Sequence, residues 1–477
     1  MAVACLLSVI GVSWCVRAAA KEERVFRAGA HAEDITPEFP ISVNGGMTDR
    51  TATVAHDRLH ARALVLDDGM TSLAIVVCDS CVIPRGIMDE AKENASKSTG
   101  IPTSNMLVSA THTHSAPTAT EVFQSKPDPK YLKKLAAGIA AAIEKAHANR
   151  VPARIGWGVG QEPNQVFNRR WRMKPGTIRA DPFGKLTDQV QMNPPIGSEN
   201  LLEPAGPTDP EVWVLAVKTL EGKPISLLAD YSLHYVGDVP GGAVSADYFG
   251  AFAERMTGLL QVASADPPFV GILANGTSGD INNINFRTAH APVPTFGRIR
   301  LVADAVAKVA FETYQSMPFH DWVPLSAKQR ELELGVRKPT PEELAYAREI
   351  LANAKGKPLA QLQEIYANET VAMNDYPDKV RLIVQALRIG DLGIAAIPCE
   401  TFVSIGLSIK RQSARKPVFT IELANGYNGY LPTAEQHALG GYETWRARSS
   451  YLEVGAAAAI ESAVLELLQE LKKGDKQ

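Results

Sequence analysis

The stretch MLVSATHTHSAP at residues 106–117 begins with five apolar or small residues and then turns abruptly polar. Short apolar runs bounded by turn residues are typical of strands buried on both faces of a sheet. A helix is predicted next, over residues 129–148, because Asp128 is a good N-cap and Pro129 loses no hydrogen bond at the first helical position. A buried strand followed by a helix is the repeating unit of α/β proteins.

Similar apolar runs recur along the whole chain. They occupy residues 63–66, 73–77, 212–217, 270–274, 382–389, 392–397 and 418–423. Further helices are predicted at 340–354, which opens with a capping-box spacing, and at 454–472. The alternation predicts an α/β fold with a mixed β-sheet core flanked by helices on both faces.

The domain organisation follows from where this alternation is interrupted. The region 161–210 is rich in Pro, Gly, Asn and Arg and shows no clear period, so we expect it to be an active-site loop region. No convincing boundary divides the chain elsewhere. We therefore expect a single domain over residues 21–477.

The composition excludes several classes of protein. Hydrophobic residues make up 45% of the 477 residues and charged residues 21%, which excludes a mainly disordered chain. Lys and Arg number 49 against 52 Asp and Glu, without a long basic run, so no nucleic-acid partner is expected. Five cysteines are too few for a disulfide-stapled scaffold. The pair Cys78 and Cys81 has the C-x-x-C spacing, but no second pair follows, so we interpret both as buried small residues.

The first twenty residues have the pattern of a signal peptide. Residues 2–16 are almost entirely apolar, and three alanines at 18–20 offer a small-residue cleavage site. The segment carries no Lys or Arg before its apolar run, so an uncleaved N-terminal anchor is the alternative. We expect an exported protein, periplasmic or secreted, without a stable transmembrane anchor, because no other segment approaches the roughly 20 apolar residues that a span needs.

The polar end of the opening stretch carries the first chemical signal. His112 and His114 are two residues apart, and in an extended backbone such residues face the same side. Neutral imidazoles suit zinc, and sites in α/β proteins gather at the carboxyl ends of strands. The alternative is structural: two surface histidines, or one hydrogen-bonded core histidine.

More polar groups follow other apolar runs. His234 follows the segment 227–233, Glu400 follows 392–397, and Tyr430 follows 418–423. A carboxylate at the end of an apolar strand is costly unless it is paired or bound to a metal. A polar loop with glycines at residues 275–283 follows a fourth run. A single histidine such as His234 is more often structural, but several such strand ends together predict a metal site.

These motifs, in this order, resemble the neutral/alkaline non-lysosomal ceramidases. The resemblance rests on the segments 112–117, 234, 279–280, 397–401, 425–433 and 442–443, and it runs from about residue 28 to the C-terminal helix. It implies the fold of the ceramidase catalytic domain. Nothing in this chain is left for the C-terminal immunoglobulin-like domain of that family, so the catalytic domain is expected to stand alone.

The resemblance also implies a cofactor, Zn²⁺, and three groups of site residues. The implied zinc ligands are His112, His234, Glu400 and Tyr430. The implied catalytic side chains are His114, Arg169 and Tyr442, although the neighbouring Arg170 leaves the choice of arginine open. We assign substrate binding to Arg170, Asp280 and Asn282. The implied reaction is hydrolysis of a ceramide-like N-acyl amide bond by a zinc-activated water.

One position departs from the family. The ceramidases carry a serine two residues after their Gly-Asp pair, whereas this chain has Asn282 there, followed by Asn283 where the family has proline. An amide has no hydroxyl that could attack or relay a proton. A mechanism that needs the serine therefore fails here, while a zinc-activated water does not depend on it.

Three alternative functions stay open. The first is a zinc hydrolase on the same scaffold with a glycan, glycoside or ester substrate, which Asn282 and the polar region 161–210 favour. The second is a barrel-type amidohydrolase, which is disfavoured because the later histidines follow no clear apolar run. The third is a binding protein without catalysis, against which Glu400 and Tyr430 count. In each enzymatic case the partner is a small-molecule, lipid or glycan substrate.

Overall fold

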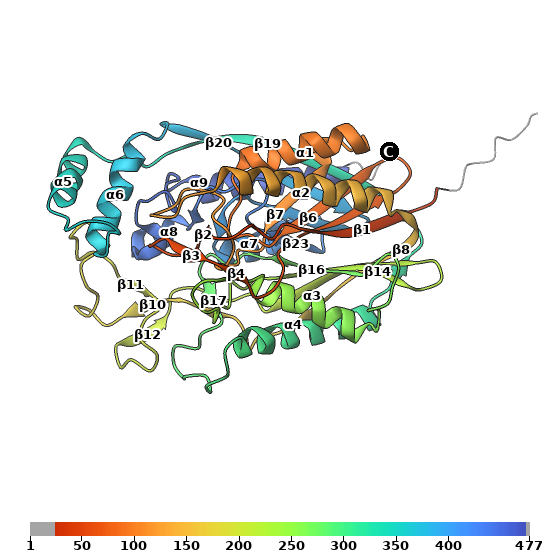
Figure 1. Cartoon of the computed structure of the whole chain (residues 1–477), viewed down its shortest axis with the longest axis horizontal. Helices are drawn as coiled ribbons and strands as arrows, with labels where there is room; N and C mark the ends of the chain where they lie inside the picture. The colour runs from red at the N-terminus through yellow and green to blue at the C-terminus, as the bar shows by residue number, and fades with distance from the viewer. Residues whose placement is uncertain (1–23, 474–477) are drawn as a thin grey trace, which may run out of the picture.

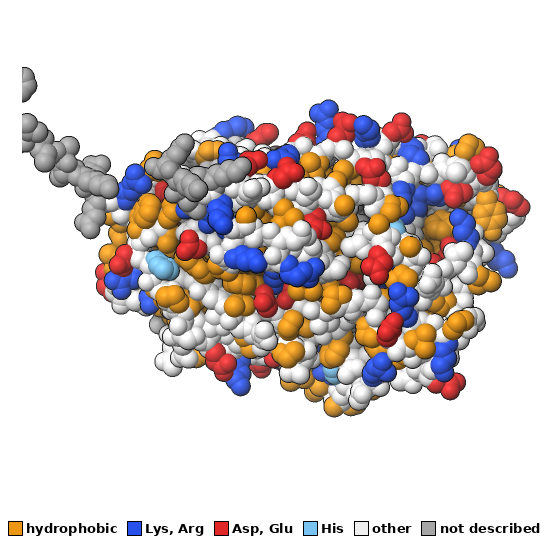
Figure 2. All heavy atoms as spheres, turned by 180° about the vertical axis from the view of Figure 1, so that it is seen from behind, with side chains coloured by type: hydrophobic (Ala, Val, Ile, Leu, Met, Phe, Trp, Pro, Cys, Tyr) orange, Lys and Arg blue, Asp and Glu red, His pale blue; other side chains and the backbone are white. Residues whose placement is uncertain are grey.

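The structure, a computed structural model, describes residues 24–473 (Figure 1). The predicted signal peptide at residues 1–20 lies outside this part of the chain. No helix within the described residues is both long and apolar enough to cross a bilayer. Lys and Arg side chains are interspersed with Asp and Glu over the face seen from behind in Figure 2.

The largest sheet of the described residues has nine strands and mixes parallel with antiparallel pairs. In order, they are β16 (Val270–Asn275), β14 (Pro224–Tyr231), β13 (Glu211–Thr219), β8 (Val151–Gln161), β1 (Arg27–Asp34), β5 (His60–Asp67), β6 (Ser72–Cys78) and β7 (Met106–Ala110), with β18 (Phe319–His320) on β8. The pairs β6 with β7 and β14 with β16 are parallel, and the others are antiparallel.

A second sheet lies against the first. It has the order β19 (Leu325–Gly335), β20 (Lys379–Ile389), β21 (Leu392–Ala396) and β23 (Val418–Ile421). Every second residue of β13 faces the second sheet. Trp213, Leu215 and Val217 belong to one apolar cluster, which also contains Leu387 and Ile389 of β20. The inner faces of the two sheets therefore bury each other.

Helices cover the two outer faces. On the large sheet they are α1 (Arg85–Thr99), α2 (Pro129–Ala148), α3 (Asp247–Leu259) and α4 (Gly297–Ser316). On the second sheet they are α7 (Val403–Gln412) and α9 (Ala456–Lys473). Figure 1 shows α1 and α2 on one side of the molecule and α3 and α4 on the other side. The predicted α/β class with a mixed sheet and flanking helices is confirmed, with the addition that two sheets are stacked between the helices.

The predicted local signals act as expected. The Asp128 carboxylate accepts the Lys130 N–H at 2.7 Å at the start of α2. Thr340 and Glu343 form the capping box that opens α5 (Pro341–Ala352), which packs beside α6 (Leu362–Asn374). Every predicted strand run coincides with a strand of the two sheets.

The region 161–210 is less irregular than its sequence suggests. It forms a small sheet in the order β11 (Val190–Met192), β10 (Arg170–Met173) and β12 (Leu201–Pro204), and β9 (Phe167–Asn168) pairs with β17 (Ile281–Asn282). Strands of two to four residues are too short to leave a visible period in the sequence.

Candidate metal centre

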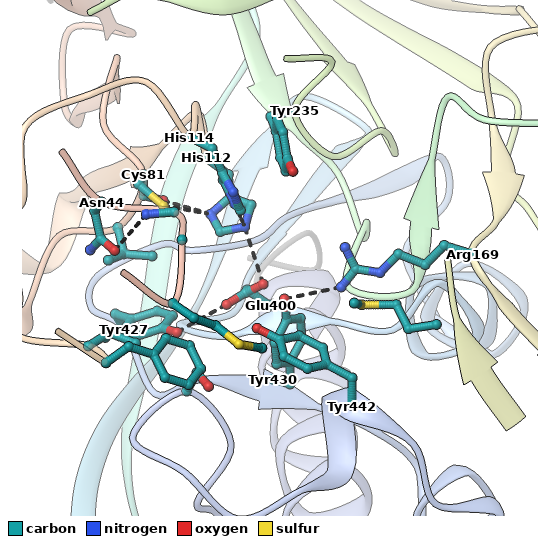
Figure 3. Close-up of a pocket in the computed structure, with 18 of the residues that line it drawn as sticks. Asn44, Cys81, His112, His114, Arg169, Tyr235, Glu400, Tyr427, Tyr430 and Tyr442 are labelled. Atoms are coloured by element: carbon teal, nitrogen blue, oxygen red, sulfur yellow. Dashed lines mark hydrogen bonds and ion pairs between the residues drawn. The ribbon is translucent and has the colours of Figure 1, made fainter. Parts of the chain in front are cut away.

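Four segments that are distant in sequence carry the predicted ligands to one place, and Figure 3 shows three of these ligands, His112, Glu400 and Tyr430. His112 follows β7 in a left-handed backbone conformation, with φ of 70°. His234 follows β14, and the parallel two-stranded pair β22 (Glu400–Thr401) and β24 (Tyr430–Leu431) places Glu400 opposite Tyr430. All four side chains are buried. The strand ends predicted to converge do converge.

The distances between these side chains suit ligands that share one ion. The Nε2 atoms of His112 and His234 are 3.0 Å apart. Glu400 Oε2 lies 3.2 Å from the Nε2 atom of His112 and 3.9 Å from that of His234. Ligand atoms about 2.0–2.1 Å from a tetrahedral zinc lie roughly 3.3 Å from one another, which is in this range.

The tautomers of the two imidazoles support the same interpretation. His112 Nδ1 donates to the Cys81 carbonyl at 2.7 Å, and His234 Nδ1 donates to the Ser278 carbonyl at 3.1 Å. When both rings are neutral, as ligation requires, each carries its only proton on Nδ1, and the two Nε2 lone pairs are free to bind one cation. Glu400 Oε2 is buried without a hydrogen-bond partner among the described residues. This donor set fits a cation such as zinc.

Two of the ligands have the charge states that ligation requires, whereas His112 must give up a proton to bind a metal. Burial lowers the pKa of His112, but the Glu400 carboxylate outweighs this effect, and the net pKa lies well above its ordinary value. Burial lowers the pKa of His234 well below its ordinary value, and the positive charges on Arg169 and His112 lower it further. Burial raises the pKa of Glu400, but His112 outweighs this effect and the net pKa is lowered. The imidazole of His234 is therefore neutral and the carboxyl of Glu400 ionised.

Tyr430 and His114 complete the centre from two sides. Tyr430 Oη accepts a hydrogen bond from Arg169 Nη2 at 3.1 Å. Burial and then the Glu400 carboxylate raise the pKa of Tyr430 well above 10, so its phenol keeps its proton unless a cation lies beside it. His114 Nε2 is 3.1 Å from His112 Nε2, and its ring stacks on Tyr235 with centroids 3.7 Å apart. His114 is thus as close to His112 as His234 is.

The structure separates the two neighbouring arginines. Arg169 lines the pocket, where Nη2 reaches Tyr430 and the Gly279 carbonyl. Arg170 is fully buried behind it and donates to Gln436 and to the Gly440 carbonyl. Glu443 lies between the two arginines, accepting from Arg169 Nε at 2.9 Å and from Arg170 Nη1 at 2.6 Å. Arg169 is therefore the arginine that faces the site.

The three residues predicted to bind substrate lie in the wall behind the pocket. Asp280 is buried and accepts from Asn168 Nδ2 and from the Val403 N–H. Asn282 is buried and donates from Nδ2 to Asn193 Oδ1 at 2.7 Å. Arg170, described above, is the third. None of the three lines the pocket, because short strands and buried hydrogen bonds hold them one layer back.

A polar loop supports the ligands from behind. Gly279 passes so close to Glu400 that an added Cβ would lie 2.5 Å from its carbonyl oxygen. Glu422 Oε1 accepts from Ser278 Oγ, and its Oε2 accepts from the Thr401 N–H, each at 2.6 Å. One buried carboxylate therefore joins the loop that holds His234 to the strand that carries Glu400. Sequence reasoning missed Glu422, although it is an acidic residue within a predicted buried run.

Cys81 was not predicted to lie at the centre. Its Sγ is 3.8 Å from His112 Nδ1, and with His112 and His114 it forms a second group that could bind a metal. His112 Nδ1 already donates to a carbonyl, however, so this group lacks the free lone pairs of the first one. The interpretation of Cys78 and Cys81 as buried, unpaired cysteines is confirmed.

We predict that Glu422 makes stability depend on pH. Burial raises the pKa of Glu422 from 4.5 to about 8. The folded state then holds this proton more tightly than the unfolded state, so the free energy of unfolding falls as the pH rises from about 4.5 to about 8. Glu422→Gln should remove this contribution. Urea unfolding across that window checks it, and a slope in the variant equal to that of the wild type would contradict the assignment.

Three of the four predicted ligands, His112, Glu400 and Tyr430, line a pocket of about 200 Å³. An adjoining groove of about 490 Å³ shares Met47, Met192 and Tyr442 with this pocket. The further apolar side chains that line the groove are Met173, Ile178, Ala180, Val190, Pro195, Leu362 and Trp445. The groove also has polar side chains, among them Arg179, Asp188 and Gln191, so its lining is mixed with a larger apolar part.

Comparison with known proteins places this geometry in a family. The structure is similar to that of a neutral ceramidase from Pseudomonas aeruginosa, with a TM-score of 0.73 at 20% identity over 95% of this chain and 75% of the other. It is also similar to a structure described as a ceramidase complexed with C2, with a TM-score of 0.70 at 20% identity over 94% and 76% of the two chains. At this identity the similarity establishes the fold.

A family model provides the stronger result. The model described as neutral/alkaline non-lysosomal ceramidase, N-terminal, matches residues 26–290, which is more than half of the 477 residues. The matched region contains His112, His114, Arg169 and His234. The chain therefore belongs to the neutral/alkaline non-lysosomal ceramidase family.

Proposed function

We propose that this protein is a zinc-dependent hydrolase that cleaves the amide bond of a ceramide-like N-acyl lipid. Membership of a ceramidase family makes the chain a hydrolase. The observation that carries the finer proposal is the convergence of two imidazole Nε2 atoms and one buried carboxylate beside a pocket. In the proposal, His112, His234 and Glu400 hold the zinc, with Tyr430 as the fourth ligand.

The remaining side chains would bind and orient the substrate and move protons. When bound, zinc supplies a Lewis acid and lowers the pKa of a coordinated water. Arg169 keeps its charge, because Tyr430 and Glu443 raise its pKa more than burial lowers it. Its guanidinium, held by Glu443, supports Tyr430 and stabilises negative charge that develops beside it. Tyr442 lines both the pocket and the groove and can donate a hydrogen bond from its phenol.

His114 is the proposed proton carrier. Burial lowers its pKa well below the ordinary value, with further lowering by His112 and Arg169, so the ring is neutral at neutral pH. Its Nδ1 has no hydrogen-bond partner among the described residues, whereas Nε2 points toward His112. A neutral imidazole at this position can take a proton from an attacking water and deliver it to a leaving amine.

We expect His114→Ala to lower kcat by about 10²- to 10⁴-fold, the usual contribution of a positioned acid or base, while the variant keeps its metal. Steady-state kinetics and elemental mass spectrometry measure the two effects separately. His147→Ala, on α2 and outside the pocket, is the matched control and should behave like the wild type. An unchanged rate in His114→Ala would show that the ring moves no proton in the slow step.

The apolar side chains of the adjoining groove support a lipid substrate. An amide held at the metal ligands could extend one chain into the groove lined by Met173, Val190 and Trp445. Burying methylene groups there is favourable by about 0.8 kcal/mol for each group. Asn282, where the family has serine, is the feature that favours a glycan, glycoside or ester substrate instead.

A substrate panel tests the proposal. The zinc-loaded protein is incubated with ceramides of different acyl length, an N-acylated sugar, a glycoside and a fatty-acid ester, and the products are identified by mass spectrometry. Fatty acid and free amine released from ceramide support the proposal. Turnover of the sugar, glycoside or ester alone would replace ceramide with that substrate class, and no turnover at all would favour a binding protein.

A further inference from the structure

Asn193 occupies the rim of the pocket on the same side as Arg169. It follows β11 directly and has a left-handed backbone conformation, with φ of 47°. Its N–H donates to the Arg169 carbonyl at 2.9 Å, which fixes the backbone beside the pocket. The side chain lines the pocket and is exposed, so a bound molecule can reach it.

The direction of its amide is set by Asn282. The Ile284 N–H, which can only donate, bonds to Asn282 Oδ1 at 2.9 Å. Asn282 must therefore present its Nδ2 on the other side, and that Nδ2 donates to Asn193 Oδ1 at 2.7 Å. A chain of two amides thus starts from a backbone N–H and ends at the rim of the pocket.

The end of this chain is a hydrogen-bond donor. Because Asn193 Oδ1 faces Asn282, the Nδ2 of Asn193 is the group left for the pocket. No acceptor for this Nδ2 is found among residues 24–473. The neighbouring Arg169 directs Nε to Glu443 and Nη2 to Gly279 and Tyr430. The rim therefore offers a neutral donor that suits an uncharged oxygen.

We propose that Asn193 determines specificity by donating a hydrogen bond from Nδ2 to a hydroxyl oxygen on the amine part of the substrate, with Asn282 as its positioning residue. This inference rests on the proposed amide hydrolysis and narrows its substrate class to N-acyl amino alcohols. It also gives Asn282 a role, because its amide carries the acceptor for the Ile284 N–H and the donor to Asn193 Oδ1 on two separate atoms.

Two isosteric substitutions each replace the hydrogen-bond donor at the rim with an acceptor. In Asn193→Asp, one oxygen still accepts from Asn282, and the donor toward the pocket becomes an acceptor. In Asn282→Asp, one oxygen still accepts from the Ile284 N–H, and the other accepts from Asn193. Asn193 must then turn its own Oδ1 toward the pocket. Asn282→Asp therefore replaces the hydrogen-bond donor that faces the pocket with an acceptor, although Asn282 itself does not line the pocket.

The experiment compares a short-chain ceramide with two analogues that lack either the C1 or the C3 hydroxyl. For wild type, kcat/KM on one of the analogues should be about tenfold lower, mainly through KM, because the bond forms in the bound substrate. Asn193→Ala leaves neither donor nor acceptor at the rim, so this discrimination should shrink to within about twofold. In the two Asp variants the hydroxyl can donate to the new acceptor instead, so they should discriminate against the methyl ether of that hydroxyl, which can only accept. Asn353→Asp, at the exposed residue that follows α5, adds the same charge and should behave like the wild type. Discrimination against the deoxy analogue that is preserved in Asn193→Ala would overturn the inference.

A different result would show that the proposed function itself is wrong. If wild type hydrolyses none of the ceramides, the amide hydrolysis is refuted whatever the variants do. Neutron diffraction from crystals in heavy water then tests the amide chain directly. The deuterons of Asn193 should point into the pocket in wild type and toward the introduced carboxylate in Asn282→Asp. The same orientation in both crystals would overturn the inference without reference to activity.

Discussion

Glu400→Ala is expected to lose both its zinc and at least about 10³ in kcat/KM. The carboxylate is the only anionic side chain in the proposed ligand group of His112, His234 and Glu400, and it is buried within 3.2 Å of His112 Nε2. A bound metal contributes several kcal/mol to the transition state, and each 1.36 kcal/mol is a factor of ten in rate. Elemental mass spectrometry measures zinc per chain, and kinetics on ceramide measures the rate.

The matched control removes a neighbour of this carboxylate instead. Tyr427 Oη donates to Glu400 Oε1 at 3.0 Å, and Tyr427→Phe deletes this hydrogen bond while keeping the ligand. Loss of such a partner of a metal ligand typically costs 10- to 100-fold in affinity or activity, which is a smaller effect. If Glu400→Ala retained one zinc per chain, Glu400 would not be a ligand.

Glu443→Ala is expected to lower the free energy of unfolding by about 3–5 kcal/mol. Glu443 is fully buried between Arg169 and Arg170 and accepts a hydrogen bond from each. Removing one partner of a buried ionic group leaves the other charges uncompensated, and the loss has this magnitude. Urea unfolding followed by circular dichroism measures it. Kinetics should also show a lower kcat, because Arg169 loses the contact that orients it toward Tyr430.

The control lies on the same segment. Glu435, on α8 (Ala434–Leu439), is exposed, so Glu435→Ala should change stability by no more than about 0.5 kcal/mol. Glu443→Gln keeps the shape and one acceptor and should fall between the two variants. A Glu443→Ala variant as stable as Glu435→Ala would show that the two arginines are solvated rather than paired with Glu443.

The buried strands could be predicted because each is a continuous apolar run. The runs at 63–66, 212–217 and 382–389 all lie in strands covered on both faces. β19 could not be found in this way. It lies at the edge of the second sheet, and its residues Lys328 to Glu333 are mostly charged or polar and partly exposed. The stacking of the two sheets could not be predicted either, since a strand covered by a sheet reads like one covered by helices.

Part of the candidate site could also be predicted from the sequence, and part could not. His112, His234, Glu400 and Tyr430 could be proposed because each follows an apolar run or belongs to a motif. The layer behind them depends on contacts between distant segments, such as Glu422 with Ser278 and Asn282 with Asn193. No local pattern encodes such pairs. Sequence reasoning therefore identified Asn282 as a departure from the family but placed it at the substrate, one residue layer too far forward.

The most direct test of the account is anomalous X-ray diffraction, at the zinc absorption edge, from crystals of the zinc-loaded protein. The account predicts one strong peak among His112 Nε2, His234 Nε2 and the Glu400 carboxylate, about 2 Å from each ligand atom. A zinc ion bound elsewhere, with these three side chains still in contact with one another, would contradict it.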